Sequence, residues 1–417
     1  MSFSARSLVL CSLFLWTNLV FSDDWPNWRG PNSNGVSNSI ELPIRWSTED
    51  NVRWKVALAE PGNSTPVVSG EKIFLTEAVG TERALACYSL VDGTLQWRKS
   101  VAAQIIEPTH NTNPFCSSSA VTDGTRVIAW YGANGIYCYD LDGNEIWKRD
   151  LGGQKHLWGY GSSPTLHENI CFLNFGPGDR SFLIALNAET GETIWQYDTP
   201  TDKVGTAEAK FQNDDFYGSW STPTIGEIDG RKQLVVSFPF YVRGFEPRSG
   251  QLLWSSPGIN ALVYTSPLIE RDMVIAMGGY NGMSLALKIE DGLKVERLWH
   301  SPKTKQRIGS GAIYGDHIYI HNDPGTAECI NLRSGETVWE QRLAGPGARG
   351  INWSSVTIAN QLCYTINQSG DCFVFKANPS FELVSINSLK ETSNSSIVPV
   401  ENKLLIRTHE HLWCIGK

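Results

Sequence analysis

A turn followed by tryptophan recurs along this chain of 417 residues and constrains its fold more than any other feature. A stretched copy, DGLKVERLW (291–299), and a degenerate copy, NPSFEL (378–383), belong to the same series. Successive tryptophan or equivalent positions are 40 to 59 residues apart, which is the period of a four-stranded propeller blade. In each complete copy glycine stands four residues before tryptophan; these copies are DGTLQW (92–97), DGNEIW (142–147), TGETIW (190–195), SGQLLW (249–254) and SGETVW (334–339).

Each repeat has the same internal order. A lead-in of small residues, such as STPVV (64–68), precedes short alternating runs such as HIYIHN (317–322), which predict β-strands. No stretch has convincing helical periodicity. Because the serine and threonine of the lead-in recur in every repeat, we interpret them as architectural rather than catalytic. Glycine supplies the positive φ of the turn, and tryptophan offers a flat face to the neighbouring repeat; these predicted docking residues are Trp54, Trp97, Trp147, Trp195, Trp254, Trp299 and Trp339.

The two ends of the series complement each other. Residues 395–417 supply three strands and stop short of a fourth, while 51–57 (NVRWKVA) supply one outer strand. Joining them closes a ring and leaves only short sheet edges. We therefore predict an all-β, eight-bladed β-propeller of four-stranded blades over 51–417, preceded by an extension at 23–50. An open solenoid or two separate β domains is the alternative.

The first 22 residues have the pattern of a targeting segment. Arg6 precedes a largely apolar run from Leu8 to Val20, and small residues stand before Asp23. Cys11 follows leucine rather than a small residue, which argues against a lipoprotein anchor. The sequence thus predicts a cleaved signal peptide at 1–22 and an exported protein, periplasmic or extracellular.

Eight cysteines remain beyond the signal peptide. Five of them occupy the same strand position in different repeats, which places them too far apart for disulfides. We expect small buried side chains, and only Cys363 and Cys372, on adjoining strands, form a pair worth testing.

Composition excludes two broad classes. With 35 Lys and Arg against 43 Asp and Glu, the net charge of −8 would repel a nucleic-acid backbone. Aromatic residues reach 11%, which argues against disorder. No nucleophile elbow, phosphate-binding loop, His-x-His or HExxH spacing, or EF-hand pattern is present, so neither a catalytic residue nor a metal ligand is assigned.

The complete repeat ALNAETGETIW (185–195) resembles the tryptophan-docking repeat of the pyrroloquinoline-quinone (PQQ) propeller family, AxDxxTGxxxW. The segment DWPNWRGPNSNGVS (24–37) is similar to the start of exported bacterial members of that family. The quinoprotein dehydrogenase branch implies a disulfide between adjacent cysteines, Ca²⁺ held by acidic and amide groups, and an aspartate base. This chain has no adjacent cysteine pair and no motif onto which those ligands transfer. The branch resembling BamB implies a binding scaffold in outer-membrane assembly, although the lipoprotein signal is absent.

A binding site is expected where the loops leading into the innermost strands converge on one mouth of the channel. Aromatic residues with a few amides and cations are typical of a small-molecule or peptide pocket. The tryptophans could instead pack between blades, and the histidines could be ordinary loop residues. The two arginines could recognise a carboxylate or balance Asp214 and Asp215. The candidate ligand-binding residues are His110, Asn111, Asn113, His156, Trp158, Trp220, Tyr264, Arg307, Arg349 and Trp353.

The sequence therefore favours an exported, monomeric, non-enzymatic propeller that binds a protein, peptide or glycan at its mouth. The alternative is a divergent oxidoreductase dependent on PQQ and Ca²⁺. No motif supports either cofactor.

Overall fold

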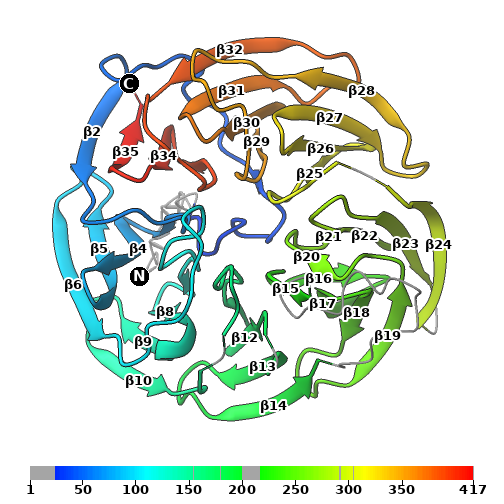
Figure 1. Cartoon of the computed structure of the whole chain (residues 1–417), viewed down its shortest axis with the longest axis horizontal. Helices are drawn as coiled ribbons and strands as arrows, with labels where there is room; N and C mark the ends of the chain where they lie inside the picture. Colours follow the sequence, from blue (N-terminus) through cyan, green and yellow to red (C-terminus); the bar gives the residue numbers. More distant parts are fainter. Residues whose placement is uncertain are drawn as a thin grey trace, which may run out of the picture.

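The computed structural model describes residues 24–153, 155–178, 180–199, 217–290, 293–303 and 305–416. The predicted signal peptide lies outside these residues. Eight four-stranded antiparallel sheets surround a central channel, with one strand of each sheet innermost and its last strand at the rim (Figure 1). The predicted eight-bladed, all-β architecture is confirmed; the short 3-10 turn η1 (Gly132–Asn134) interrupts blade 2 between two of its strands.

The first four blades follow the chain, each from the channel outward. Blade 1 contains β3 (Val67–Ser69), β4 (Lys72–Val79), β5 (Glu82–Ser89) and β6 (Leu95–Ala102). Blade 2 contains β7 (Val121–Thr122), β8 (Arg126–Trp130), β9 (Ile136–Asp140) and β10 (Glu145–Arg149). Blade 3 contains β11 (Thr165–His167), β12 (Ile170–Phe175), β13 (Phe182–Asn187) and β14 (Thr193–Asp198), and blade 4 contains β16 (Thr224–Ile228), β17 (Arg231–Phe238), β18 (Tyr241–Phe245) and β19 (Leu252–Pro257).

The other four blades have the same order, with two additions. Blade 5 contains β21 (Leu268–Glu270), β22 (Met273–Met277), β23 (Ser284–Glu290) and β24 (Lys294–Ser301), and blade 6 contains β25 (Ala312–Tyr314), β26 (His317–Asn322), β27 (Thr326–Asn331) and β28 (Thr337–Arg342). Blade 7 contains β29 (Thr357–Ala359), β30 (Leu362–Ile366), β31 (Asp371–Lys376) and β32 (Leu383–Ser388), with β1 (Val36–Ser37) added in parallel to β29. Blade 8 contains β33 (Val398–Val400), β34 (Lys403–Arg407), β35 (His411–Ile415) and β2 (Val52–Ala57); the short strands β15 (Gly218–Ser219) and β20 (Leu262–Val263) pair outside the blades.

Blade 8 joins the two ends of the propeller. β2 pairs antiparallel with β35, with Trp54 opposite Cys414, so the strand near residue 54 completes the C-terminal sheet as predicted. Buried apolar residues lie mainly between adjacent blades; Ile128 of blade 2, for example, packs in one cluster with Leu173 of blade 3.

The docking tryptophans link each blade to the next through the recurring turn. Trp195, for example, donates its indole N–H to Pro247 O of blade 4 at 2.9 Å, and a Cβ at Gly250 would lie 2.5 Å from the same indole. The turn glycine therefore leaves room for the ring as well as adopting a positive φ. Trp254 differs, because it donates to Gln233 Oε1 within its own blade at 2.7 Å. The other donors to a following blade are Trp54, Trp97, Trp147, Trp299 and Trp339, at 2.8–3.2 Å.

A ring of hydrogen bonds explains the serine and threonine of the lead-in. Two residues before the innermost strand of every blade, a backbone N–H donates to the hydroxyl of the equivalent residue in the next blade. The ring runs from Thr65 to Ser119, Ser163, Thr222, Ser266, Ser310, Ser355 and Ser396 and back to Thr65, with N···O distances of 2.8–3.2 Å. The repeated residue thus has a structural role in every blade.

All eight cysteines beyond the signal segment are buried free thiols. Cys363 stands opposite Phe375, and Cys372 stands opposite Ile366, so the candidate disulfide pair is out of register and does not form. Desolvation by burial raises the pKa of both thiols.

The N-terminal extension crosses the channel, as the blue trace in Figure 1 indicates. Asp24 accepts a hydrogen bond from the Gly70 N–H, just beyond the end of β3 that lies away from its lead-in loop. Trp25 pairs with Val68 of blade 1, and β1 pairs with β29 of blade 7. Between them Arg29, 3% exposed, donates to Val356 O at 2.8 Å and to Gly311 O at 2.6 Å. The extension is therefore anchored on both sides of the channel. Nowhere in the described chain is a helix long and apolar enough to cross a membrane.

Candidate functional site

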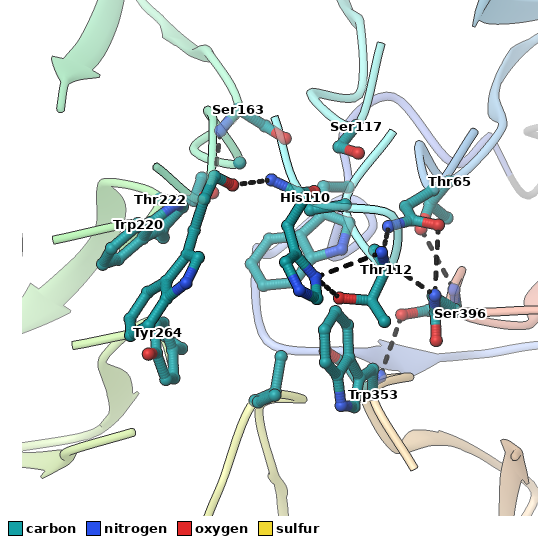
Figure 2. A pocket seen from close by; sticks show the side chains of 18 of the residues that line it. Thr65, His110, Thr112, Ser117, Ser163, Trp220, Thr222, Tyr264, Trp353 and Ser396 are labelled. Atoms are coloured by element: carbon teal, nitrogen blue, oxygen red, sulfur yellow. Dashed lines mark hydrogen bonds between the residues drawn. The ribbon is translucent and has the colours of Figure 1, made fainter. Parts of the chain in front are cut away.

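A cavity of about 400 Å³ occupies the channel mouth, and loops from around the ring line it (Figure 2). Trp28 reaches it from the extension that crosses the far end of the channel. The extension therefore crosses the channel next to the cavity and contributes Trp28 to its lining. Besides Trp28, the aromatic lining residues are Trp158, Trp220, Tyr264, Tyr280 and Trp353, and the amide lining residues are Asn63, Asn113, Asn394 and Gln306.

Aromatic side chains form one wall of the cavity. The strands β15 and β20 run parallel with Ser219 beside Val263, which places the following residues, Trp220 and Tyr264, next to each other with ring centroids 5.0 Å apart. Trp158 completes the group at 6.0 Å from Trp220. Trp220 is fixed by donating its indole N–H to Gly159 O at 2.9 Å.

Polar residues and a further tryptophan form the facing wall, which Figure 2 shows across the cavity from Trp220 and Tyr264. The indole N–H of Trp353 and the amide of Gln306 both donate to Asp323 Oδ2, at 3.4 and 3.0 Å. Burial raises the pKa of Asp323, and the Trp353 hydrogen bond partly offsets that rise. His110 Nδ1 lies 2.7 Å from Thr112 Oγ1 of its own loop.

The amides are held in place by the loops themselves. Asn113 Nδ2 donates to Trp158 O at 2.7 Å and to Tyr160 O at 2.9 Å. Asn63 and Asn394 both donate to Thr112 O, at 2.9 and 3.2 Å. These contacts orient the lining before any ligand is bound.

The structure brings six of the ten candidate residues to this cavity: His110, Asn113, Trp158, Trp220, Tyr264 and Trp353. Asn111 and Arg349 are not among the lining residues; Arg349 is exposed and donates its backbone N–H to Ser369 Oγ. His156 lies behind Trp220, with ring centroids 4.9 Å apart, and is 7% exposed.

The side chain of Arg307 is buried and already paired within the protein. It is 3% exposed, forms an ion pair with Glu328 at 2.9 Å and donates to Asn322 Oδ1 at 2.9 Å. Its carboxylate partner is therefore Glu328 of blade 6, and Asp214 and Asp215 lie outside the described residues. The ion pair with Arg307 lowers the pKa of Glu328 against the opposing effect of burial.

Sequence reasoning missed Trp28, Tyr280, Gln306, Asn63 and Asn394. Trp28 stands in the DWPNWRG segment, which resembles the start of exported family members but does not indicate a position inside the channel. Asn63 directly precedes the Ser-Thr-Pro lead-in of blade 1. The residue before each lead-in was therefore the sequence position that could have indicated a place in the cavity lining.

The cavity is lined mainly by aromatic, amide and hydroxyl side chains. Among the described residues that line it there is no aspartate, glutamate, lysine or arginine. Desolvation by burial raises the pKa of the Tyr264 phenol, which stays protonated near neutral pH.

The donor set does not fit PQQ with Ca²⁺. Calcium takes six to eight oxygen ligands, with carboxylates prominent among them, and the quinone carries several carboxylates that need cationic partners. The described lining offers neither group. Elsewhere, on blade 8, Glu391, Glu410 and His411 bring possible metal-ligand atoms within 4.8 Å of one another, but Glu391 already accepts hydrogen bonds from Thr408 and Trp413.

Comparisons with known proteins agree with this architecture. Residues 83–341 match the family described as outer membrane protein assembly factor BamB. The chain is 20% identical over 364 residues to BamB of Burkholderia pseudomallei, covering 78% of this chain and 87% of that protein. It is 24% identical over 291 residues to BamB of Shewanella oneidensis, covering 66% of this chain and 65% of that protein.

Two solved structures share the fold at low sequence identity. The crystal structure of BamB from Moraxella catarrhalis aligns with a TM-score of 0.63 and 11% identity over 87% of this chain and 96% of its own. Quinohemoprotein alcohol dehydrogenase from Comamonas testosteroni aligns with a TM-score of 0.66 and 11% identity over 95% of this chain and 81% of its own. Identity this low supports the propeller fold and nothing finer.

Proposed function

Because this chain belongs to the BamB family of PQQ-like β-propellers, we propose that it is an exported binding or scaffold protein, without catalytic activity, that takes its ligand or partner at the channel mouth. The relatives are named as assembly factors, which is a role in binding rather than in catalysis.

The observation that carries the proposal is the group of six aromatic side chains that line one cavity at the channel mouth. Large aromatic surfaces provide contact area at low entropic cost. Within the described lining, the His110 imidazole contacts the hydroxyl of Thr112 in its own loop. No carboxylate of that lining orients the imidazole as a general base would require. The chemistry of this surface suits recognition.

A pair of exposed tyrosines allows a direct test. Tyr280 is 48% exposed and lines the mouth, whereas Tyr314 is 38% exposed and lies at the end of β25 outside the cavity. A photo-crosslinking amino acid placed at either position in exporting cells should capture a ligand or partner from position 280 and nothing specific from position 314. Equal capture from both positions would contradict binding at the mouth.

The alternative, a divergent oxidoreductase that uses PQQ and Ca²⁺, predicts a different result. A cofactor at 100 times its dissociation constant would add about 2.7 kcal/mol to stability. A saturable rise in melting temperature with PQQ and Ca²⁺, followed by dye-linked oxidation of an alcohol or sugar, would establish the alternative and overturn the proposal.

Export is part of the same proposal. N-terminal sequencing of the protein recovered from the envelope or the medium should begin at Asp23. Recovery of a chain that still begins at Met1 in the soluble cell fraction would contradict it.

A further inference from the structure

We propose that the ligand of the mouth cavity is the uncharged end of a carbohydrate chain, an inference that rests on the proposed function. Three features carry it: aromatic side chains around the cavity, hydrogen-bonding groups of both polarities, and a described lining without aspartate, glutamate, lysine or arginine.

The aromatic residues suit a sugar ring. A pyranose presents a face of C–H groups that packs on an indole or phenol face, while its hydroxyls point outward around its edge. Trp28 of the extension lines the cavity, the neighbouring rings of Trp158, Trp220 and Tyr264 form one wall, and Trp353 lies across from Trp220 in Figure 2. Several sugar faces can therefore be contacted within one site.

The hydroxyl ring supplies donors at the base of the cavity. Thr65, Ser163, Thr222, Ser355 and Ser396 each line it and each accept one N–H from the neighbouring blade. Within the described chain, none of these five hydroxyls donates to a protein acceptor. Accepting one hydrogen bond strengthens a hydroxyl as a donor. These residues are only 1–7% exposed, so a ligand oxygen must lie directly against the cavity wall to accept from them.

Acceptors lie among the amides. Both donor hydrogens of Asn113 are engaged by Trp158 O and Tyr160 O, which leaves its Oδ1 as an acceptor. Gln306 gives one N–H to Asp323 and retains its Oε1. A sugar hydroxyl both donates and accepts, so it satisfies this mixture of groups. Their fixed orientation lowers the ordering cost of binding.

Charge separates carbohydrates from the competing ligands. The extension is held across the channel by Arg29 and places Trp28 in the cavity lining, so a polymer that enters from the mouth meets the extension with its end. The end of a peptide carries an ammonium or a carboxylate, and a nucleotide or PQQ carries phosphates or carboxylates. Burying such a charge without a partner is costly, and the described lining provides no aspartate, glutamate, lysine or arginine to pair with it. The end of a neutral polysaccharide meets no such penalty.

The test uses calorimetric titration of the purified protein with neutral linear hexasaccharides of glucose, xylose, mannose and N-acetylglucosamine. Acidic hexasaccharides of galacturonate, an unrelated hexapeptide, and PQQ with Ca²⁺ serve as charged probes. At least one neutral hexasaccharide should bind. Tyr280→Ala should weaken that binding by about three- to tenfold, as expected for one stacked aromatic ring, while Tyr314→Ala should leave it unchanged.

The outcomes separate the inference from the function on which it rests. Binding of a charged probe that depends on Tyr280, without binding of any neutral hexasaccharide, overturns the carbohydrate assignment and leaves mouth binding intact. Neutral binding that is equally strong in Tyr280→Ala and Tyr314→Ala places the site elsewhere and overturns both. For the hexasaccharide that binds, a bulky label at one end should abolish binding while the same label at the other end does not; equal effects at both ends refute entry by a chain end.

Discussion

Gly250 of blade 4 tests why the recurring turn contains glycine. Gly250 and Gly230 both have a φ of +72°, but a Cβ at Gly250 would lie 2.5 Å from Cδ2 of Trp195, whereas a Cβ at Gly230 would meet nothing within 4 Å. Alanine at either position costs about 1 kcal/mol of unfolding free energy for its left-handed backbone. At Gly250 alanine must also move the indole by about 1 Å to reach an ordinary carbon–carbon separation.

That displacement has a calculable cost. Overpacking adds about 1–3 kcal/mol, and weakening the hydrogen bond from Trp195 Nε1 to Pro247 O, now 2.9 Å, adds about 1 kcal/mol. Gly250→Ala should therefore lose about 3–5 kcal/mol, against about 1 kcal/mol for Gly230→Ala.

Urea unfolding followed by circular dichroism, with the denaturant dependence compared between variants, measures both losses. In a double-mutant cycle, Trp195→Leu should remove most of the excess cost of Gly250→Ala, because it removes the obstructing ring. Equal losses in the two glycine variants would mean that backbone conformation alone selects glycine, and would refute the steric argument.

Three further outcomes follow from buried polar groups. Ser163→Ala should cost about 1–3 kcal/mol in urea unfolding because it leaves the Ser119 N–H unpaired, whereas Ser162→Ala, which removes a buried hydroxyl without a partner, should cost less than about 0.5 kcal/mol. Burial lowers the pKa of His321 from 6.5 to about 3, so the stability gained from its buried neutral imidazole is fully present above pH 6.5 and is lost on acidification. The unfolding free energy should therefore fall by about 2 kcal/mol between pH 7.5 and 5 because of this one residue. His321→Gln should make that fall correspondingly smaller. Arg29→Met should release the extension from Val356 and Gly311 and hasten its cleavage in limited proteolysis, while an unchanged cleavage rate would contradict its role as the anchor.

The fold was predictable because the same sequence signal recurs in most of the blades. The pairing of turn and tryptophan recurs at a blade period, and each copy obeys the same local physics of a positive-φ turn and a flat ring. The closure of blade 8 by residues 51–57 followed from counting strands. Trp254 departs from the common hydrogen bond where the next copy of the turn is the stretched one at 291–299, so even this exception had a sequence signal.

The site was predictable only in part, since its residues occur once each. Loop position identified Trp158 and Trp353, because all lead-in loops converge on one mouth. It misjudged Arg307, which lies in the loop before β25 and pairs with Glu328 of β27, a contact that could not be inferred from spacing. It also missed Trp28, because nothing local in the sequence indicates that an N-terminal segment crosses the channel.

The division between repeated and unrepeated residues also separates structure from specificity. The hydroxyl ring and the docking tryptophans are shared by the blades, so they hold the ring closed and cannot by themselves distinguish one ligand from another. Specificity must come from residues in which the blades differ. At this mouth those are the aromatic group around Trp220, the amides around Asn113 and Trp28 of the extension, all uncharged. A propeller with the same repeat but with carboxylates and guanidinium groups at these positions would bind a charged ligand, so exchanging these few side chains should change ligand class without changing the fold.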